Sequence, residues 1–170
     1  GKTFFYKDNR DNIETTLNGF LVSNMIQVIG DKDGILVGED FVADVPSIAL
    51  TTAHIDVADI LNDGDLQMIL GNDSGSIIIE EGAMVSVQNA GLAAFVSPFV
   101  TNNGIINARV GNVVIGAAEH VTLDLYGDGL IEVTASGELE DALIQNNGKI
   151  LALGGNVQIT ALSAKETIDN

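Results

Sequence analysis

The stretch VTNNGIINARVGNVVIGA, residues 100–117, recurs 44 residues later as IQNNGKILALGGNVQITA, residues 144–161. Laid over each other without gaps, the two copies are identical at ten of eighteen positions. The identical pairs are Asn102/Asn146, Asn103/Asn147, Gly104/Gly148, Ile106/Ile150, Ala108/Ala152, Gly111/Gly155, Asn112/Asn156, Val113/Val157, Ile115/Ile159 and Ala117/Ala161. Each pair is a turn former or an alternating apolar residue, so the segment is a repeated structural unit.

The apolar residues of each copy recur at every second position. Ile106 and Ala108 alternate with polar residues, and the alternation resumes over residues 113–117 after a Gly-Asn corner. A period of two is the signature of a β-strand. The interval of 44 residues fits two coils of about 22 residues each, within the range typical of solenoids. The sequence therefore predicts an all-β solenoid with coils of about 22 residues.

The corners between the predicted strands carry Asn and Gly. In a stacked solenoid, equivalent corner side chains lie above one another, and Asn can form ladders of side-chain amide hydrogen bonds. We expect these residues to have a structural role. The predicted corner residues are Asn103, Gly104, Gly111, Asn112, Asn147, Gly148, Gly155 and Asn156.

Three more segments extend this prediction. A weaker third copy covers residues 73–87, with Ile77 in a role comparable to that of Ile106, and its spacing predicts an insertion or a shorter turn before the first copy. Residues 121–133 predict two strands around a turn at 126–129, with Val121 and Leu123 pointing inward. Residues 136–145 have apolar residues at helical spacing, which predicts a short helical turn leaving the coil.

The composition agrees with many short strands and excludes some partners. The chain is 46% hydrophobic but only 5% aromatic, and it contains 19 Gly. β-Branched residues suit strands, and Gly suits the corners between them. The formal charge of −17 repels nucleic acid, which is excluded as a partner, and anionic lipid. No apolar run approaches the ~20 residues that span a bilayer, so membrane insertion is not expected.

Cysteine usage and the N-terminal residues leave the compartment open. The absence of Cys excludes a disulfide scaffold, a thiolate zinc site and a Cys nucleophile. The first residues, GKTFFYKDNRDN, lack the apolar core of a signal peptide. We therefore expect either a mature fragment of an exported protein or a cytosolic protein.

Residues 17–56, LNGFLVSNMIQVIGDKDGILVGEDFVADVPSIALTTAHID, resemble a known family. The pattern is similar to the haemagglutination-activity domain of filamentous haemagglutinin-like exoproteins, the passengers of two-partner secretion. Asn18 and Gly19 match the first turn of that family, and residues 31–35 occupy the second, with Asp31 and Lys32 in place of Asn and Pro. Residues 88–133 and the C-terminal Asn-Gly corners resemble the β-helix coils that follow, so the resemblance covers about residues 12–165.

The resemblance implies a fold, a location and a role. The fold would be a right-handed parallel β-helix, with residues 20–170 as one domain of coils and residues 1–19 as a cap, connector or tail. The protein would be extracellular or displayed on the surface of a Gram-negative bacterium, where it would serve adhesion or biofilm matrix. Its partners would be a glycan of a host surface, a neighbouring cell or the matrix, and the outer-membrane transporter during secretion.

Two other functions stay open from the residues alone. A self-assembling extracellular filament subunit would associate end to end, because the open end of a β-helix is a row of unpaired backbone groups. A polysaccharide-active β-helix enzyme would need a base beside carboxylates in a groove. The basic residues, however, are scattered and build no obvious cleft, so we expect no enzyme activity and no catalytic residues. They are Lys2, Lys7, Arg10, Lys32, Arg109, Lys149 and Lys165.

Candidate ligating residues are few, and we expect neither a metal nor a cofactor. Of the two histidines, His54 is expected to face solvent, and His120 lies next to a corner and is assigned no role. Asn72 and Asp73, in the segment GNDSGS, resemble one unit of a calcium-binding repeat, so calcium at this corner is the alternative left open. The remaining candidates are the carboxylates at 124, 128 and 132, which surround a turn and are interpreted as solubilising surface charge. They are Asp124, Asp128 and Glu132.

Overall fold

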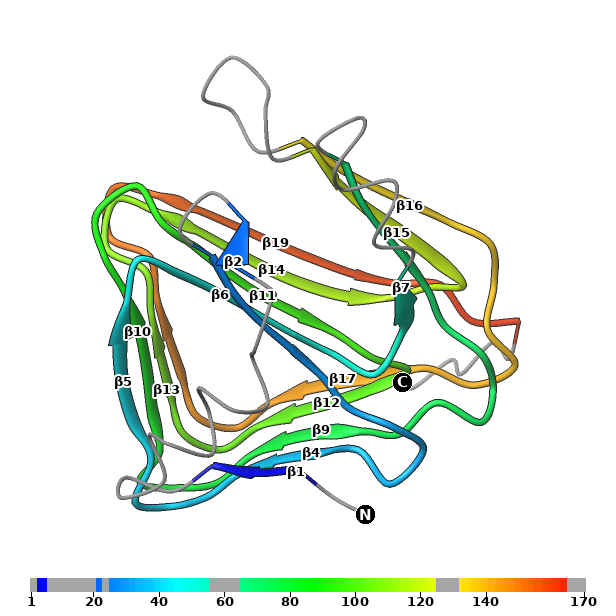
Figure 1. Cartoon of the computed structure of the whole chain (residues 1–170), viewed down its shortest axis with the longest axis horizontal. Helices are drawn as coiled ribbons and strands as arrows, with labels where there is room; N and C mark the ends of the chain where they lie inside the picture. The colour runs from blue at the N-terminus through cyan, green and yellow to red at the C-terminus, as the bar shows by residue number, and fades with distance from the viewer. Residues whose placement is uncertain (1–2, 6–20, 23–24, 56–64, 125–131, 165–170) are drawn as a thin grey trace, which may run out of the picture.

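The computed structural model describes residues 3–5, 21–22, 25–55, 65–124 and 132–164. These residues form β-strands and connecting turns, with no helix among them, as the sequence predicts for an all-β chain (Figure 1). The strands belong to four sheets, of which three are built mainly from parallel strands. No helix of the described part is both long and apolar enough to cross a membrane.

Three sheets form the body of the molecule. In each of them, the strands between β4 and β19 pair in parallel. The first sheet contains β1 (Thr3–Phe5), β4 (Ile35–Val37), β9 (Ile77–Ile79), β12 (Phe99–Asn102) and β17 (Leu143–Asn146). The second contains β5 (Val42–Val45), β10 (Met84–Val87), β13 (Ile105–Asn107) and β18 (Lys149–Leu151). The third contains β2 (Leu21–Val22), β3 (Met25–Ile29), β6 (Ser47–Thr51), β11 (Leu92–Val96), β14 (Asn112–Ala117) and β19 (Asn156–Ala161).

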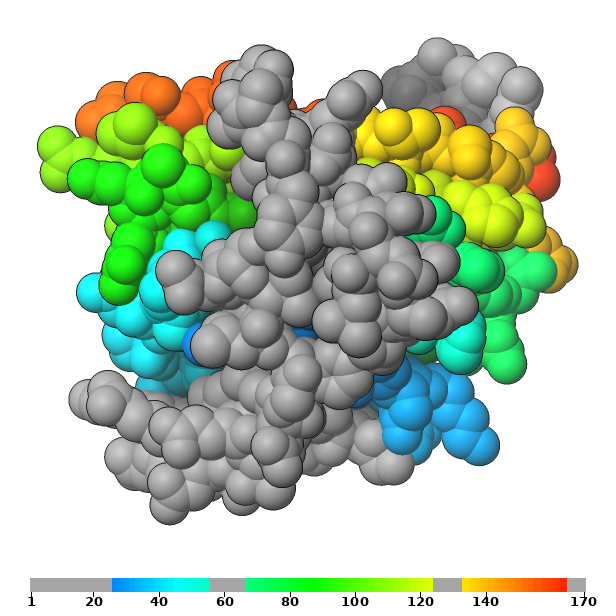
Figure 2. Space-filling model, turned by 45° about the horizontal axis from the view of Figure 1, so that its top comes forward, coloured from blue at the N-terminus to red at the C-terminus, as the bar shows by residue number. Residues whose placement is uncertain are grey.

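The chain visits these three sheets in the same order again and again. We call one passage through the first, second and third sheets a rung. The complete rungs of the described residues are β4–β6, β9–β11, β12–β14 and β17–β19. Equivalent residues of successive rungs are register partners, as with Ile77, Val100 and Ile144. Figure 2 shows successive parts of the chain as bands, from cyan through green to orange.

The two repeat copies lie on neighbouring rungs, which corrects the spacing inferred from the sequence. Val100 pairs directly with Ile144, and Ile115 pairs with Ile159, so one rung and not two separates the copies. The extra residues between them form the strands β15 (His120–Asp124) and β16 (Glu132–Ser136). Periodicity cannot distinguish two short coils from one coil with an insertion, because both have the same length.

The weak third copy is also a rung, in a different alignment from the predicted one. Ile77 on β9 pairs with Val100, whereas the partner of Ile106 is Val85 on β10. The predicted equivalence of Ile77 and Ile106 is therefore wrong, and β11 leads directly into β12 with no inserted strand between the two rungs. The segment is recognised weakly because its corner carries Glu80 and Glu81 where the later rungs carry Asn.

The main core lies between the three parallel sheets. Its side chains come from alternate strand positions, and the predicted inward residues Ile106, Val113 and Ile115 are all buried. The rungs stack these residues in columns, so burial continues along the molecule. The buried residues of this core are Val28, Ile35, Val37, Phe41, Ala43, Ile48, Leu50, Ile77, Ile79, Ala83, Val85, Val87, Ala93, Phe95, Val100, Ile106, Ala108, Val113 and Ile115.

A fourth sheet creates a second core on the outside of the third sheet. It is antiparallel, in the order β16-β15-β8-β7, with β8 spanning Asp65–Ile69 and β7 spanning His54–Ile55. The second core joins third-sheet residues such as Ala94 and Val114 to Met68 and Leu123 of the fourth sheet. The third sheet is therefore buried on both faces, which explains why β11 is buried at every position.

The predicted strand pair within residues 121–133 is confirmed, and the predicted helix is wrong. Leu123 pairs with Val133 in antiparallel register, and Val121 and Leu123 are buried as expected. Residues 136–145 form the end of β16, a loop and the start of β17, with no helix. Gly137 has φ 78°, a left-handed conformation that a helix interior does not accommodate.

Most of the predicted N-terminal segment, residues 1–19, lies outside the described residues. The described part, Thr3–Phe5, forms β1 and pairs in parallel with β4, with Thr3 opposite Ile35. This short strand extends the first sheet beyond the β4–β6 rung.

Candidate functional site

Asparagine ladders join the last two rungs at three corner positions. Asn147 donates to Asn103 over 2.9 Å and Asn156 donates to Asn112 over 3.3 Å, as the corner pattern predicts. A third ladder, at 2.8 Å, joins Asn102, which is completely buried, to the exposed Asn146. The corner set predicted from sequence omits this pair, although its identity in the two copies was a usable signal.

The corner glycines allow the rungs to stack closely. A Cβ atom on Gly148 would meet the carbonyl oxygen of Gly104, and one on Gly155 would meet that of Gly111. The stacked backbone therefore requires Gly at these positions, in keeping with the structural role that the sequence predicts for them.

The corner before the third sheet adopts a left-handed conformation in three rungs. The φ angles are 62° at Ala90, 55° at Val110 and 74° at Gly154. A β-branched residue is strained in this region, whereas Gly is not. Val110 is thus a strained residue on the surface of the molecule, half exposed beside Gly154.

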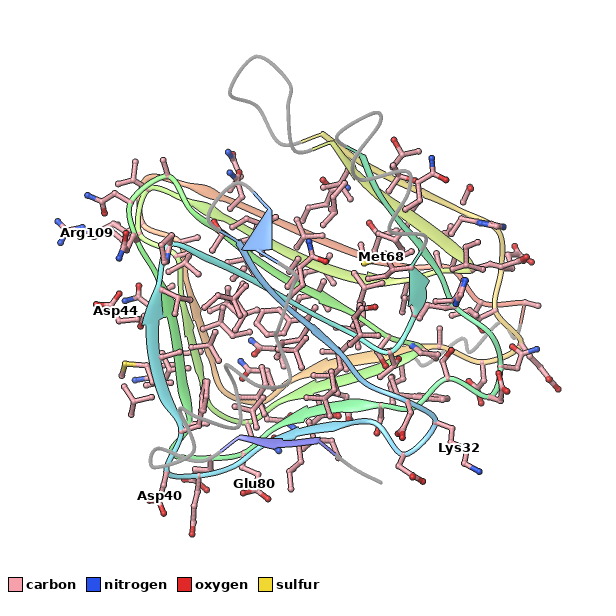
Figure 3. The ribbon with its side chains drawn as sticks, viewed as in Figure 1. Lys32, Asp40, Asp44, Met68, Glu80 and Arg109 are labelled. Atoms are coloured by element: carbon pink, nitrogen blue, oxygen red, sulfur yellow. The ribbon has the colours of Figure 1, made fainter. Side chains whose placement is uncertain are left out.

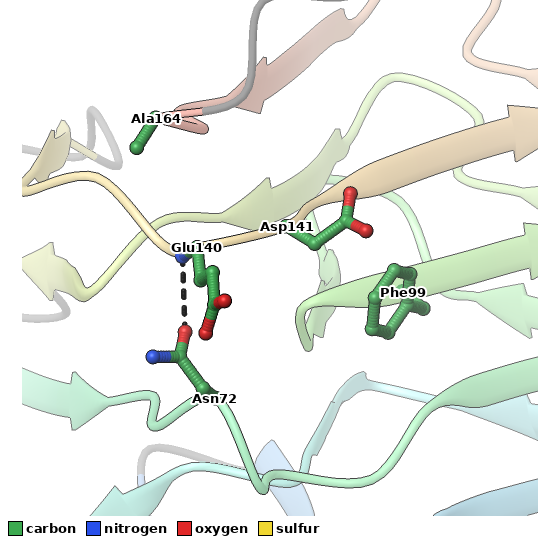
Figure 4. Close-up of a pocket in the computed structure, with 5 residues that line it drawn as sticks. All are labelled: Asn72, Phe99, Glu140, Asp141 and Ala164. Atoms are coloured by element: carbon green, nitrogen blue, oxygen red, sulfur yellow. Dashed lines mark hydrogen bonds between the residues drawn. The ribbon is translucent and has the colours of Figure 1, made fainter.

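A pocket of about 480 Å³ lies where the chain returns to the rungs after β8 and again after β16 (Figure 4). Asn72 comes from the turn after β8, Phe99 begins β12, and Glu140 and Asp141 lie in the loop between β16 and β17. Ala164, after β19, completes the described lining. We call this the Asn72–Glu140 pocket.

Hydrogen bonds hold the pocket walls in place. The Glu140 backbone N–H donates to Asn72 Oδ1 over 2.9 Å, joining loops that are 68 residues apart (Figure 4). The Leu139 N–H donates to the Leu162 carbonyl over 3.0 Å, and the Ala164 N–H donates to the Leu139 carbonyl over 2.8 Å. Leu139 itself is buried in the second core, so the acidic loop is anchored on both sides.

The calcium candidates from sequence do not form a ligand set in the described structure. Asn72 Oδ1 already accepts the Glu140 N–H, and the neighbouring Asp73 is exposed. No group of three or more His, Cys, Asp or Glu side chains in the described ranges can hold a metal ion. Asn72 therefore has a structural use that the sequence did not indicate.

A second depression, of about 690 Å³, lies on the outer face of the second sheet. Its lining includes Val42, Asp44, Met84, Ser86 and Arg109, and both Asp44 and Arg109 point away from the core (Figure 3). The sequence predicts no cleft at Arg109, but stacking brings this residue to the same surface as Asp44. The two residues come from different rungs, so their proximity is invisible in the sequence.

A third depression, of about 510 Å³, lies at an acidic corner lined by Glu39, Glu80, Glu81, Asn103 and Asn147. The Glu39 N–H donates to Glu80 Oε2 over 3.1 Å, so one carboxylate is used to join two rungs. The corner continues into the Asn103–Asn147 ladder, and amide pairs thus replace carboxylates along the stack.

The other sequence candidates lie on the fourth sheet. His54 is exposed, as predicted, His120 is exposed as well, and both pair with Ile69 of the strand between them. His120 Nε2 lies 3.4 Å from Glu119 Oε1. In the same sheet Asp124 is the register partner of Glu132, whereas Asp128 lies outside the described residues.

Residues 31–35 form a turn that Asp31 stabilises with its side chain. Asp31 Oδ1 accepts the Asp33 N–H over 2.8 Å, and the Gly34 N–H donates to the Asp31 carbonyl over 3.0 Å. The bond from the Asp33 N–H lowers the pKa of the Asp31 carboxyl below its usual value. Gly34, with φ 87°, completes the turn.

Comparison with known proteins assigns the chain to no family. No protein-family model matches the sequence, and no curated protein sequence matches it.

Proposed function

We propose that this chain is a right-handed parallel β-helix that serves as a structural and adhesive segment of a secreted or surface-displayed bacterial exoprotein. The observation that carries the proposal is the continuous stacking of rungs in register, with columns of buried apolar residues and corner asparagine ladders. Such stacking makes a stiff body whose length grows with the number of rungs. Right-handedness is the rule for parallel strands joined by crossovers.

The β17–β19 rung carries exposed apolar residues on its third-sheet strand. Ile159 is 49% exposed although its partner on the preceding rung, Ile115, is 1% exposed. Val157 is likewise 46% exposed while Val113 is buried. This last rung repeats the apolar and Asn pattern of the rung before it and lacks the polar outer face of a capping repeat. It therefore offers a template for further strands.

A self-assembling filament subunit is the second candidate function, supported by the same exposed rung. Filament growth would place the other end of a second copy on the β17–β19 rung. At that other end, however, the inward residues Ile48 and Leu50 of the β4–β6 rung are buried. End-to-end association of two copies would need this covered end to open. We therefore prefer the structural and adhesive segment to the filament subunit.

The location and partners of the proposed segment follow from the family resemblance. A filamentous haemagglutinin-like passenger would be recognised by an outer-membrane transporter and would act outside the cell on glycans of a host surface, a neighbouring cell or the matrix. The well-formed turn at Asp31 and Gly34 is consistent with a recognition role for this region, despite the departure from Asn-Pro.

Electron microscopy of the purified chain, with light scattering in the presence and absence of calcium, tests the proposal. Monodisperse single particles are expected under both conditions. Fibres of uniform width would instead establish the filament subunit. Release of reducing ends or unsaturated products from acidic glycans would contradict a non-enzymatic role and support a polysaccharide-active enzyme.

A further inference from the structure

We propose that the Asn72–Glu140 pocket binds one uncharged sugar residue of a glycan. The inference rests on the proposed adhesive function and names a site for it. The pocket volume of about 480 Å³ lies within the range of small-molecule sites, roughly 300–1,000 Å³.

The pocket is preorganised, which lowers the entropy lost on binding. The loop that carries Glu140 is held by the bond to Asn72, by the pairing of Leu139 with the segment after β19, and by the bond from the Leu143 N–H to the Pro98 carbonyl. On the opposite side, the Gly71 N–H donates to Ser74 Oγ over 3.0 Å and fixes the turn that carries Asn72. Both polar walls are therefore in place before a ligand arrives.

The walls supply the groups that recognise sugar hydroxyls. Because Asn72 Oδ1 accepts the Glu140 N–H, the orientation of the carboxamide is set, with its nitrogen on the side away from Phe99 in Figure 4. Glu140 is exposed, and its carboxylate, which accepts hydrogen bonds only, extends toward Asn72 in Figure 4. A sugar hydroxyl can donate to this carboxylate.

Phe99 supplies the apolar surface of the same pocket. Its ring is half-buried at the start of β12 and borders the pocket opposite Asn72 (Figure 4). A pyranose ring has an apolar face of C–H groups between its hydroxyls, and an aromatic ring covers such a face favourably. The depression on the second sheet has no aromatic residue in its described lining, so it lacks this part of the arrangement.

The charge of the pocket selects among ligands. Glu140 and Asp141 both line it, and the whole chain has a formal charge of −17, so anionic sugars and phosphates are repelled. A bare cation would use the carboxylates but leave the Phe99 ring without a role. A neutral sugar uses both the Glu140 carboxylate and the Phe99 ring.

Saturation-transfer NMR of the full chain tests the site. The probes are the methyl glycosides of glucose, galactose, mannose and N-acetylglucosamine at millimolar concentration. We expect transfer to at least one probe, and binding about tenfold weaker in Glu140→Ala, from loss of a hydrogen bond to a charged group. Phe99→Leu should weaken binding to a similar degree. Glu138→Ala is the matched control, because Glu138 is exposed in the same loop but does not line the described pocket.

The outcomes separate this site from the proposed function. Transfer to none of the probes, equal transfer in wild type and Glu140→Ala, or loss of transfer in Glu138→Ala would overturn the site. Monodisperse particles without sugar binding would overturn the pocket and leave the proposed structural segment intact, whereas sugar binding by a chain that forms uniform fibres would do the reverse. Because Glu140 is exposed, its variant tests the pocket even where Phe99→Leu disturbs folding.

Discussion

The buried side chain of Asn102 donates to the carboxamide oxygen of Asn146 on the next rung over 2.8 Å. Asn102 Oδ1 also accepts the Gly104 N–H at 3.1 Å, so one amide joins two rungs and closes its own corner. Inside a protein such a bond is strong, and removing one partner leaves the other unsatisfied.

Replacing Asn102 by Ala should therefore destabilise the protein by about 2–3 kcal/mol, because the buried Gly104 N–H loses its acceptor. Asn103→Ala is the matched control, since the Asn103–Asn147 ladder is exposed and should contribute less than about 1 kcal/mol. Urea unfolding followed by circular dichroism measures both values. Equal losses in the two variants would show that burial does not determine the strength of the ladder.

The corner at Val110 should become more stable when its side chain is removed. Its φ of 55° is costly for a β-branched residue, and the equivalent corner residue in the next rung is Gly154. Val110→Gly should raise the free energy of unfolding by about 1 kcal/mol, after allowing for the greater freedom of Gly in the unfolded chain. Val110→Ala keeps the Cβ atom and should gain less. A fall in thermal midpoint for Val110→Gly would show that the corner is not strained.

The exposed last rung predicts unequal costs at equivalent positions. Ile115→Ala, in the buried core, should cost about 3–4 kcal/mol, whereas Ile159→Ala should cost about 1–2 kcal/mol, because half of the Ile159 side chain is already in water. The pair occupies matching register positions on adjacent strands. Equal costs of the two substitutions, measured by denaturant unfolding at low protein concentration, would mean that the last rung is covered in solution. If the cost of Ile159→Ala then changed with protein concentration, a second copy of the chain would be what covers it.

The turn at Asp31 should contribute a small pH dependence. Its carboxylate accepts the Asp33 N–H, and the pKa is lowered from the usual 3.8. A lowered folded-state pKa means that the contribution is complete above the unfolded-state value and is lost as the pH falls through the folded-state value. NMR titration should place the Asp31 midpoint below 3.8, and Asp31→Asn should keep the turn while removing its titration. A midpoint at or above 3.8 would show that the bond does not persist in solution.

Alternation and corner chemistry were predictable because they are local. Strand period places Ile106 and Ile115 inside, and Asn and Gly mark the corners, whatever the distant parts of the chain do. The ladders between those corners also need the rungs to stack in register, because they join residues 44 positions apart. The helix expected at residues 136–145 was wrong because its apolar residues pack in two different places. Leu139 is buried in the second core, while Leu143 begins a strand beside β12.

The sequence by itself determined the all-β character, the strand alternation and the corner residues, since each depends on residues close together in the chain. Only the tertiary structure decided that the two copies are direct neighbours, because an inserted strand pair and an additional coil occupy the same length of sequence. It also decided that Asn72 meets Glu140, a contact between loops 68 residues apart. Contacts of that kind depend on how rungs stack and where insertions return, and no local pattern encodes them.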